Sequence, residues 1–150
     1  MRRTQIGVFI HLVWGSWDRL PLLSPEIEQV VYRAISAKCA ELGVQVVTIG
    51  GIEDHVHLLI RFPATLSIAD LVKEIKGASS HLVTHGSSLA PGRVFKWQGA
   101  YAAFSVSPRQ VLQVRDYIAR QKEHHLAGSL ISEWELAPEN DSRSLTAADG

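Results

Sequence analysis

The chain has 150 residues, 46% of them apolar and 20% charged. This length suits one domain with a buried core and argues against two domains. Its longest apolar runs, such as VFIHLVW at residues 8–14, are too short to cross a bilayer, and the N-terminus lacks the small-residue cleavage site of a signal peptide. The single cysteine, Cys39, excludes an internal disulfide and suits a reducing cytoplasm.

The net charge is zero, but the charges are unevenly distributed. Residues 1–127 hold 14 Lys and Arg against 10 Asp and Glu, whereas residues 128–150 hold one Arg against five acids. We therefore expect a mildly basic domain at residues 1–130 and an acidic, flexible tail at residues 131–150. A zero net charge alone argues against a nucleic-acid partner, and the basic body reopens that possibility.

Apolar periodicity, helix-capping residues and glycines predict seven elements. In chain order they are a strand at 5–14, a helix at 25–43, strands at 44–52 and 55–62, a helix at 68–86, a strand at about 100–106 and a helix at 108–128. The order β-α-β-β-α-β-α predicts an α+β fold of the ferredoxin-like, split β-α-β kind. Its four-stranded antiparallel sheet carries two helices on one face. The other face is expected to be open, and the last helix is added at the C-terminal end.

Two histidines lie one residue apart in the predicted strand HVHLLIRF. Side chains alternate along a strand, so His55 and His57 share one face, and Val56 and Leu58 share the other. The apolar face must meet the helices, which places both imidazoles on the open face. This spacing suits two nitrogen ligands of one metal ion, although an isolated His-x-His is more often a pair of surface histidines.

The last predicted helix carries a tyrosine and a glutamine four residues apart, Tyr117 and Gln121, and His124 lies at the same angle one turn further on. A phenol is a weak nucleophile at neutral pH because its pKa is near 10, and a nearby cation would make the phenoxide accessible. A divalent ion held by His55, His57 and Gln121 could also polarise a phosphodiester. The alternative role for Tyr117 is packing at the edge of the core.

Other histidines offer competing ligand sets. His81 and His85 are also four residues apart on a helix, but the segment HLVTH lacks the glutamate of the zinc-protease motif. We read these two as helix-surface residues, and His11 as a hydrogen-bonded sheet residue. A zinc hydrolase therefore remains a distant alternative.

Five segments together resemble a known family in order and spacing: FIHLVWGSWDRLPLL, GGIEDHVHLLI, LVKEIKGASS, KWQGAYAAFSVS and VRDYIARQKEHH. Over residues 5–127 the chain resembles the single-tyrosine HUH transposases, the small IS200-like enzymes and their REP-associated relatives. The resemblance implies a homodimer with composite active sites that acts on single-stranded DNA hairpins at element ends, in the nucleoid of a bacterium or archaeon.

The resemblance also implies a role for each site residue. His55, His57 and Gln121 match the ligands of Mg²⁺ or Mn²⁺. Tyr117 matches the nucleophile, which attacks a DNA phosphodiester to give a 5′-phosphotyrosine and a free 3′-hydroxyl. Strand transfer is the reverse reaction and needs no ATP.

Several other side chains are candidates for contact with DNA. Trp97 and Tyr101 could stack on unpaired bases, although we expect core packing for both. The basic residues nearest the motifs are Arg61, Lys73, Lys76, Lys96, Arg120 and Lys122. The main alternative to a transposase is a non-catalytic or domesticated module of the same fold that binds single-stranded nucleic acid. RNA-binding sheets use a strand with an Arg/Lys-Gly-Phe motif, and this sequence has no such motif, which argues against that alternative.

Overall fold

The computed structural model describes residues 3–86 and 95–136. The predicted loop at residues 87–93 lies outside the described residues, as does the predicted tail beyond residue 136. The strands are β1 (Phe9–Gly15), β2 (Gln45–Ile52), β3 (His55–Arg61) and β4 (Ala102–Val106). The helices are α1 (Pro25–Glu41), α2 (Ile68–Gly86), α3 (Val111–Ala119) and α4 (Gln121–Ala127), with short 3₁₀ turns η1 (Trp17–Arg19), η2 (Pro108–Gln110) and η3 (Ser132–Trp134).

The four strands form one antiparallel sheet in the order β2-β3-β1-β4. This confirms the predicted split β-α-β arrangement, with β1 and β3 in the middle. The first strand is shorter than predicted, since residues 5–8 precede it. None of the helices in the described part of the chain combines the length and the apolar character of a membrane span.

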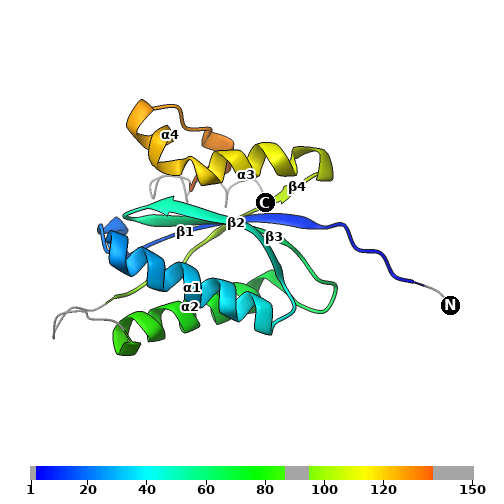
Figure 1. The fold of residues 1–150 in the computed structure, drawn as a ribbon, viewed down its shortest axis with the longest axis horizontal. Helices are drawn as coiled ribbons and strands as arrows, with labels where there is room; N and C mark the ends of the chain where they lie inside the picture. Colours follow the sequence, from blue (N-terminus) through cyan, green and yellow to red (C-terminus); the bar gives the residue numbers. More distant parts are fainter. Residues whose placement is uncertain (1–2, 87–94, 137–150) are drawn as a thin grey trace, which may run out of the picture.

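The main core lies between the sheet and the pair α1 and α2 (Figure 1). Val56, Leu58 and Ile60 of β3 point into it and are fully buried, together with Leu12 and Trp14 of β1. Alternation along β3 therefore sends the apolar side chains to the helices, as predicted.

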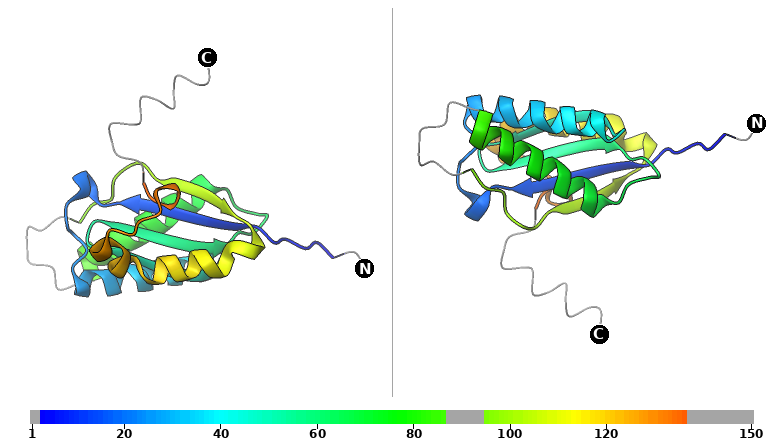
Figure 2. Two further views of the ribbon diagram at one scale, coloured as in Figure 1. Left: turned by 90° about the horizontal axis from the view of Figure 1, so that it is seen from above. Right: turned by 90° about the horizontal axis from the view of Figure 1, so that it is seen from below.

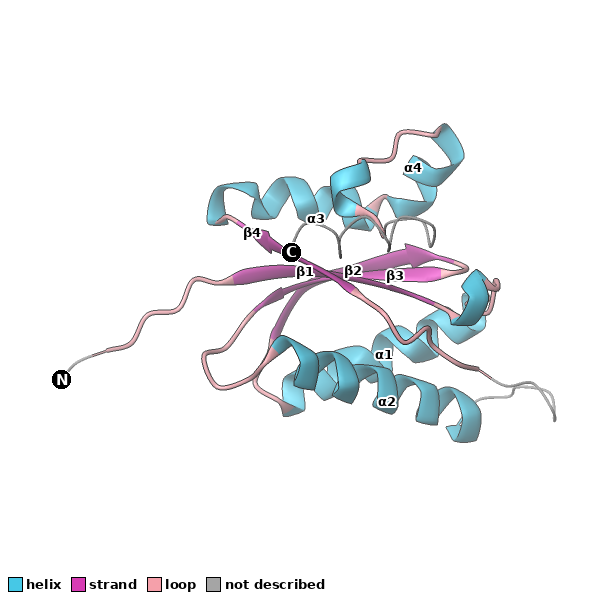
Figure 3. Cartoon of the chain, turned by 180° about the vertical axis from the view of Figure 1, so that it is seen from behind, coloured by secondary structure: helices cyan, strands magenta, loops and turns pink. Residues whose placement is uncertain are grey.

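The opposite face of the sheet is not open, and this prediction was wrong. Helices α3 and α4 of the same chain lie over it, so the sheet is sandwiched between two helical layers (Figures 1 and 3). The contact is a second apolar cluster that includes Leu59 of β3, Val106 of β4, and Val114 and Ile118 of α3. The link through η2 is short enough to fold α3 back onto its own sheet, as the view from above shows (Figure 2).

The single helix predicted at residues 108–128 is also divided. It is interrupted at Arg120, whose backbone angles (φ −106°, ψ 24°) are not helical, and Gln121 begins α4. No glycine or proline occurs between residues 109 and 127, so the local sequence carries no signal for the break. The break places both Tyr117 and Gln121 in buried positions, 3% and 1% exposed, over the sheet.

Helix α3 approaches β2 closely at Gly50, where an added Cβ would overlap the carbonyl oxygen of Ile118. We expect Gly50→Ala to lower the free energy of unfolding by about 1–3 kcal/mol, because backbone rather than a flexible side chain must move. The matched control is Gly77→Ala in α2, where an added Cβ meets nothing within 4 Å and alanine favours the helix by up to about 1 kcal/mol. Urea unfolding of both variants measures the difference, and equal stability would contradict the close packing of α3 on β2.

Candidate active site

The histidine pair lies at the start of β3, on the face covered by α3 and α4. His55 and His57 are 1% and 0% exposed, so neither is a surface histidine. The two-residue turn at Glu53 and Asp54 joins β2 to β3 and fixes His55 as the first residue of the strand. The imidazoles therefore share a face, as alternation predicted.

Each imidazole is held through its Nδ1 atom. The Nδ1 of His55 lies 2.7 Å from Oδ1 of Asp54, which also accepts a bond of 3.3 Å from Arg19 Nη2. The Nδ1 of His57 lies 2.8 Å from Nε2 of His11 in β1. His11 is thus a hydrogen-bonded sheet residue, as predicted. A partner on Nδ1 orients the ring and leaves Nε2 directed into the site, the usual arrangement of metal-binding histidines.

The phenol of Tyr117 lies beside the pair within the same chain. Its ring centre is 6.2 Å from that of His57. The hydroxyl donates to Oε1 of Glu135 at 2.5 Å and accepts from the backbone N–H of Ile131 at 3.1 Å. Burial raises the pKa of Tyr117 to about 12, and the Glu135 carboxylate adds to this shift, so the phenol is protonated at neutral pH.

Gln121 supplies an amide oxygen beside the pair. Its Oε1 lies 3.4 Å from Nε2 of His55 and 3.1 Å from Nε2 of His125. The amide nitrogen of Gln121 is buried and has no hydrogen-bond partner among the described residues. His124 stacks on the Tyr117 ring, with ring centres 4.6 Å apart, so it packs against the nucleophile candidate.

A residue that sequence reasoning missed completes the site. Glu135, directly after η3, places Oε2 3.0 Å from Nε2 of His57 and 3.5 Å from Nε2 of His55. The region was read as a flexible acidic tail, but residues 131–136 are among those described, and Ile131 and Trp134 pack against the second apolar cluster. Trp134 and Leu136, the two apolar residues that flank Glu135, were the available signal. The division into domains at residue 130 stays a prediction.

Burial and charge shift the pKa values of the three groups in different directions. Burial lowers the pKa of His57. Burial also disfavours charge on His55, but hydrogen bonds to Asp54 and Glu135 outweigh it and raise the pKa of that imidazole. Burial alone would raise the pKa of Glu135, yet His55, His57 and Tyr117 hold it well below its ordinary value. Glu135 is therefore a carboxylate at neutral pH.

These donors suit a divalent cation. Among residues 3–86 and 95–136, the cluster of His, Cys, Asp and Glu that could hold a metal is His55, His57 and Glu135, whose ligand atoms lie within 4.8 Å of one another. The Nε2 of His57 is buried and has no partner in hydrogen-bond geometry, although Glu135 is close. A buried nitrogen that points past its neighbours into a shared space is what a metal ligand requires.

The zinc alternative lacks support. His81 and His85 lie on the exposed side of α2, with ring centres 4.5 Å apart, and they belong to no three-ligand cluster in the described part of the chain. Helix α2 lies under the sheet face opposite to Tyr117 (Figure 1).

The predicted DNA-contact residues are scattered. Arg61 is at the far end of β3 from His55 and donates to the carbonyl of Ile6. Lys73 is exposed on α2. Arg120 and Lys122 flank Gln121, and Lys122 pairs with Glu28 at 2.7 Å.

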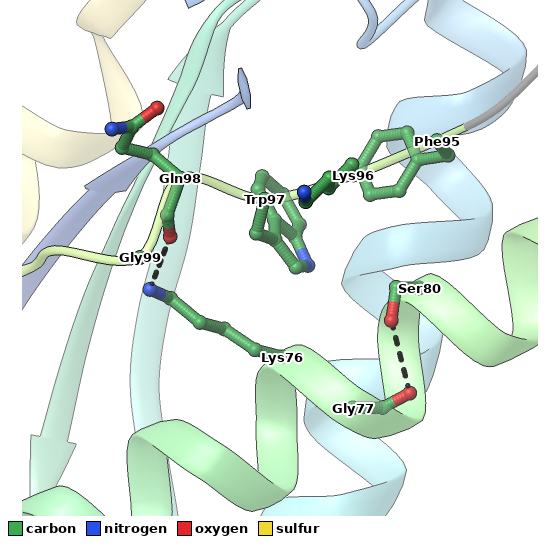
Figure 4. A pocket seen from close by; sticks show the side chains of 8 residues that line it. All are labelled: Lys76, Gly77, Ser80, Phe95, Lys96, Trp97, Gln98 and Gly99. Atoms are coloured by element: carbon green, nitrogen blue, oxygen red, sulfur yellow. Dashed lines mark hydrogen bonds between the residues drawn. The ribbon is translucent and has the colours of Figure 1, made fainter. Parts of the chain in front are cut away.

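Lys76 and Lys96 instead line a cavity of about 320 Å³ between α2 and residues 95–99 (Figure 4). Lys76 Nζ donates to the carbonyls of Gln98 and Ala100, and burial lowers its pKa to about 8. Trp97 is buried and donates its indole N–H to Ser79 Oγ, which confirms core packing for that ring. Tyr101 is 37% exposed and was wrongly expected in the core.

An exposed aromatic ring stands near the pair. Trp17 is 46% exposed, with Lys96 Nζ 3.9 Å from its ring centre. The bridge from Ser16 to Trp97 and the pairing of Gly15 with His55 set this ring and its lysine at the end of the sheet where β3 begins. Sequence reasoning did not single out Trp17.

A buried histidine pair on an antiparallel sheet, faced by a tyrosine and a glutamine from the C-terminal helices, defines the chain as a single-tyrosine HUH transposase. The profile of the family described as Transposase IS200 like matches residues 4–121, and the chain belongs to this family.

Known proteins agree with this assignment. The ISDra2 transposase TnpA of Deinococcus radiodurans is 28% identical over 116 residues, which cover 75% of this chain and 83% of that protein. A structure from Deinococcus radiodurans R1, described as a transposase, superposes with a TM-score of 0.61 at 25% identity, over 81% of this chain and 96% of that one. The fold is also that of a REP-associated tyrosine transposase bound to a REP hairpin, with a TM-score of 0.61 at 17% identity, over 83% of this chain and 72% of that one.

Proposed function

We propose that this transposase cleaves and rejoins single-stranded DNA, with Tyr117 as its nucleophile. The observation that carries the proposal is the convergence, within one chain, of the Tyr117 hydroxyl and the Nε2 atoms of His55 and His57 on one buried space. Both groups also contact the same carboxylate, which keeps the phenol within reach of anything the imidazoles hold.

In the proposed reaction the Tyr117 oxygen forms a bond to a DNA phosphorus, and the bond from phosphorus to the 3′ oxygen breaks. The phenol proton ends on the departing oxygen as a free 3′-hydroxyl, and the 5′ side stays on the protein as a phosphotyrosine. Attack by a 3′-hydroxyl on that phosphotyrosine reverses the step and joins a strand, so no external energy source enters.

His55, His57 and Gln121 would hold Mg²⁺ or Mn²⁺, as their donor atoms and burial allow. When bound, the ion supplies polarisation of the phosphoryl oxygens and stabilisation of the leaving oxygen. His11 and Asp54 fix the two rings from behind, so the chain's own contribution is orientation of the donors and exclusion of water.

The substrate proposed here is a single-stranded DNA hairpin, and the REP-associated relative was solved bound to a REP hairpin. A homodimer with composite sites stays a prediction. Because Tyr117 already faces His57 within one chain, a single subunit holds every proposed catalytic group.

The test is incubation of the full chain with a pool of single-stranded hairpin oligonucleotides and Mn²⁺. We expect a slower-migrating protein band that carries 5′-linked DNA and survives denaturation. Hairpin binding without this band in any metal or sequence context would leave the non-catalytic alternative as the function.

Trp17 and Lys96 lie together at the end of the sheet where β3 begins, and we expect the exposed Trp17 ring to stack on an unpaired base beside the cleaved strand. Because one base–aromatic stack contributes about 1–3 kcal/mol, Trp17→Ala should raise the hairpin Kd by about 5- to 100-fold. Fluorescence anisotropy with a labelled hairpin measures the change. Leu82→Ala, at an exposed apolar residue of α2, is the control. Equal affinity of both variants would place the strand elsewhere.

A further inference from the structure

The segment after α4 returns to the centre of the site. Ile131 donates its N–H to the Tyr117 hydroxyl, and the Trp134 ring packs 5.1 Å from the Tyr117 ring. Both contacts come from residues that precede Glu135 and anchor the segment that carries it, and the Glu135 side chain is 13% exposed. Glu135 is therefore seated by packing and not only by its charge.

The two carboxylate oxygens of Glu135 face different groups. Oε1 accepts from the Tyr117 hydroxyl, while Oε2 lies 3.0 Å and 3.5 Å from the Nε2 atoms of His57 and His55. The Nε2 of His57 nevertheless has no partner in hydrogen-bond geometry, so this nitrogen is not aimed at the carboxylate.

These separations are those of ligands around one ion. Two donors at adjacent corners of an octahedron lie about 3.0 Å apart when each is about 2.1 Å from the metal, as Mg²⁺ requires. The separations from His57 to Glu135, from His55 to Glu135 and from His55 to Gln121 are 3.0, 3.5 and 3.4 Å. Three of the separations among these four donors are therefore close to this geometry.

Charge favours the same assignment. Two imidazoles and an amide oxygen are all neutral ligands, whereas hard divalent ions prefer sites that include a carboxylate. Glu135 supplies the negative oxygen that His55, His57 and Gln121 lack.

We infer that Glu135 is a metal ligand, donated by the segment that follows the last helix, and that its second oxygen ties the bound ion to the nucleophile Tyr117. The inference rests on the proposed function for the identity of the ion, Mg²⁺ or Mn²⁺. Metal binding itself can be measured without DNA. Loading of the ion and ordering of residues 131–136 are then linked, since the same carboxylate serves both.

The test is Mn²⁺ binding to the full chain, without DNA, by calorimetry. We expect Glu135→Ala to weaken binding at least tenfold and Glu135→Gln, which keeps the shape and one neutral oxygen, to weaken it less. Glu133→Ala, an exposed acid of the same segment, is the matched control and should leave the Kd unchanged. If Glu135→Ala binds Mn²⁺ as tightly as the native chain or more tightly, the carboxylate only occupies the space of the ion, and the inference is overturned.

Hydrogen exchange gives a second readout, because Mn²⁺ should change amide exchange in opposite directions if Glu135 binds the ion and if the ion displaces it. A ligand role predicts that Mn²⁺ slows amide exchange in residues 131–136, and a carboxylate displaced by the ion predicts faster exchange. Failure here is distinct from failure of the proposed function. If the chain binds Mn²⁺ through Glu135 but never attaches DNA, Glu135 is a metal ligand and the proposed reaction is refuted. If the chain attaches DNA but Glu135→Ala leaves the Mn²⁺ affinity unchanged, the proposed reaction stands and the ligand role of Glu135 is refuted.

Discussion

Tyr117→Phe is expected to abolish covalent attachment of DNA, by about 10³-fold or more, while hairpin binding stays nearly unchanged. The substitution removes one atom, the proposed nucleophile. The ring keeps its packing against His57, His124 and Trp134, because these contacts involve its faces and edges and not its hydroxyl. Denaturing gels with a labelled hairpin measure attachment, and anisotropy measures binding.

The matched control is Tyr32→Phe on α1. Its hydroxyl is buried and has no hydrogen-bond partner among the described residues, and it lies on the sheet face opposite to Tyr117. Attachment in Tyr32→Phe should equal that of the native chain. A covalent complex that persists in Tyr117→Phe would refute the nucleophile assignment, whatever the control shows.

Strand alternation explains why the histidine pair could be located from sequence. A period of two leaves only two ways to orient β3, and placing Val56, Leu58 and Ile60 in water would expose three large apolar side chains. The sequence placed His11 only as a hydrogen-bonded sheet residue, and the structure adds that it lies opposite Leu59 and beside His57 on the face of β1 that carries the site.

The division of the last helix could not be predicted, because its cause is tertiary. Residues near Arg120 favour a continuous helix, and the close packing of Ile118 on Gly50 together with the burial of Gln121 decides against it. When contacts with a distant strand decide where a helix breaks, the local sequence does not indicate the position of the break.

Glu135 was missed for a related reason. An acidic, proline-containing end is typical of a flexible tail, and nothing in its period indicates a return to the sheet. The contacts that seat it, from Ile131 and Trp134 to Tyr117, are few and lie close to a helix end, where composition is a weak guide. The face expected to be open is thus covered by the chain itself.

Metal removal is expected to stop the reaction as completely as loss of the nucleophile. In EDTA the native chain should form no covalent product, and Mn²⁺ should restore it, because leaving-group stabilisation depends on the ion. His57→Ala should lose attachment by about 10²-fold or more and should not be rescued by Mn²⁺, since it removes a buried ligand nitrogen. His81→Ala, at an exposed histidine of α2, is the control and should behave as the native chain.

The EDTA arm uses the native chain, so it stands even if His57→Ala is destabilised by the loss of its bond to His11. Thermal unfolding of the variant separates that loss of stability from loss of the ligand. Turnover that is equal with and without EDTA would mean that the imidazoles act without an ion. Their buried Nε2 atoms, one of which has no hydrogen-bond partner in the described structure, would then have to contact the phosphate directly, and each such contact requires a proton on that Nε2. Burial lowers the pKa of His57, which makes a protonated His57 unfavourable at neutral pH. His55, whose hydrogen bonds to Asp54 and Glu135 raise its pKa despite burial, would then be the imidazole that carries the extra proton.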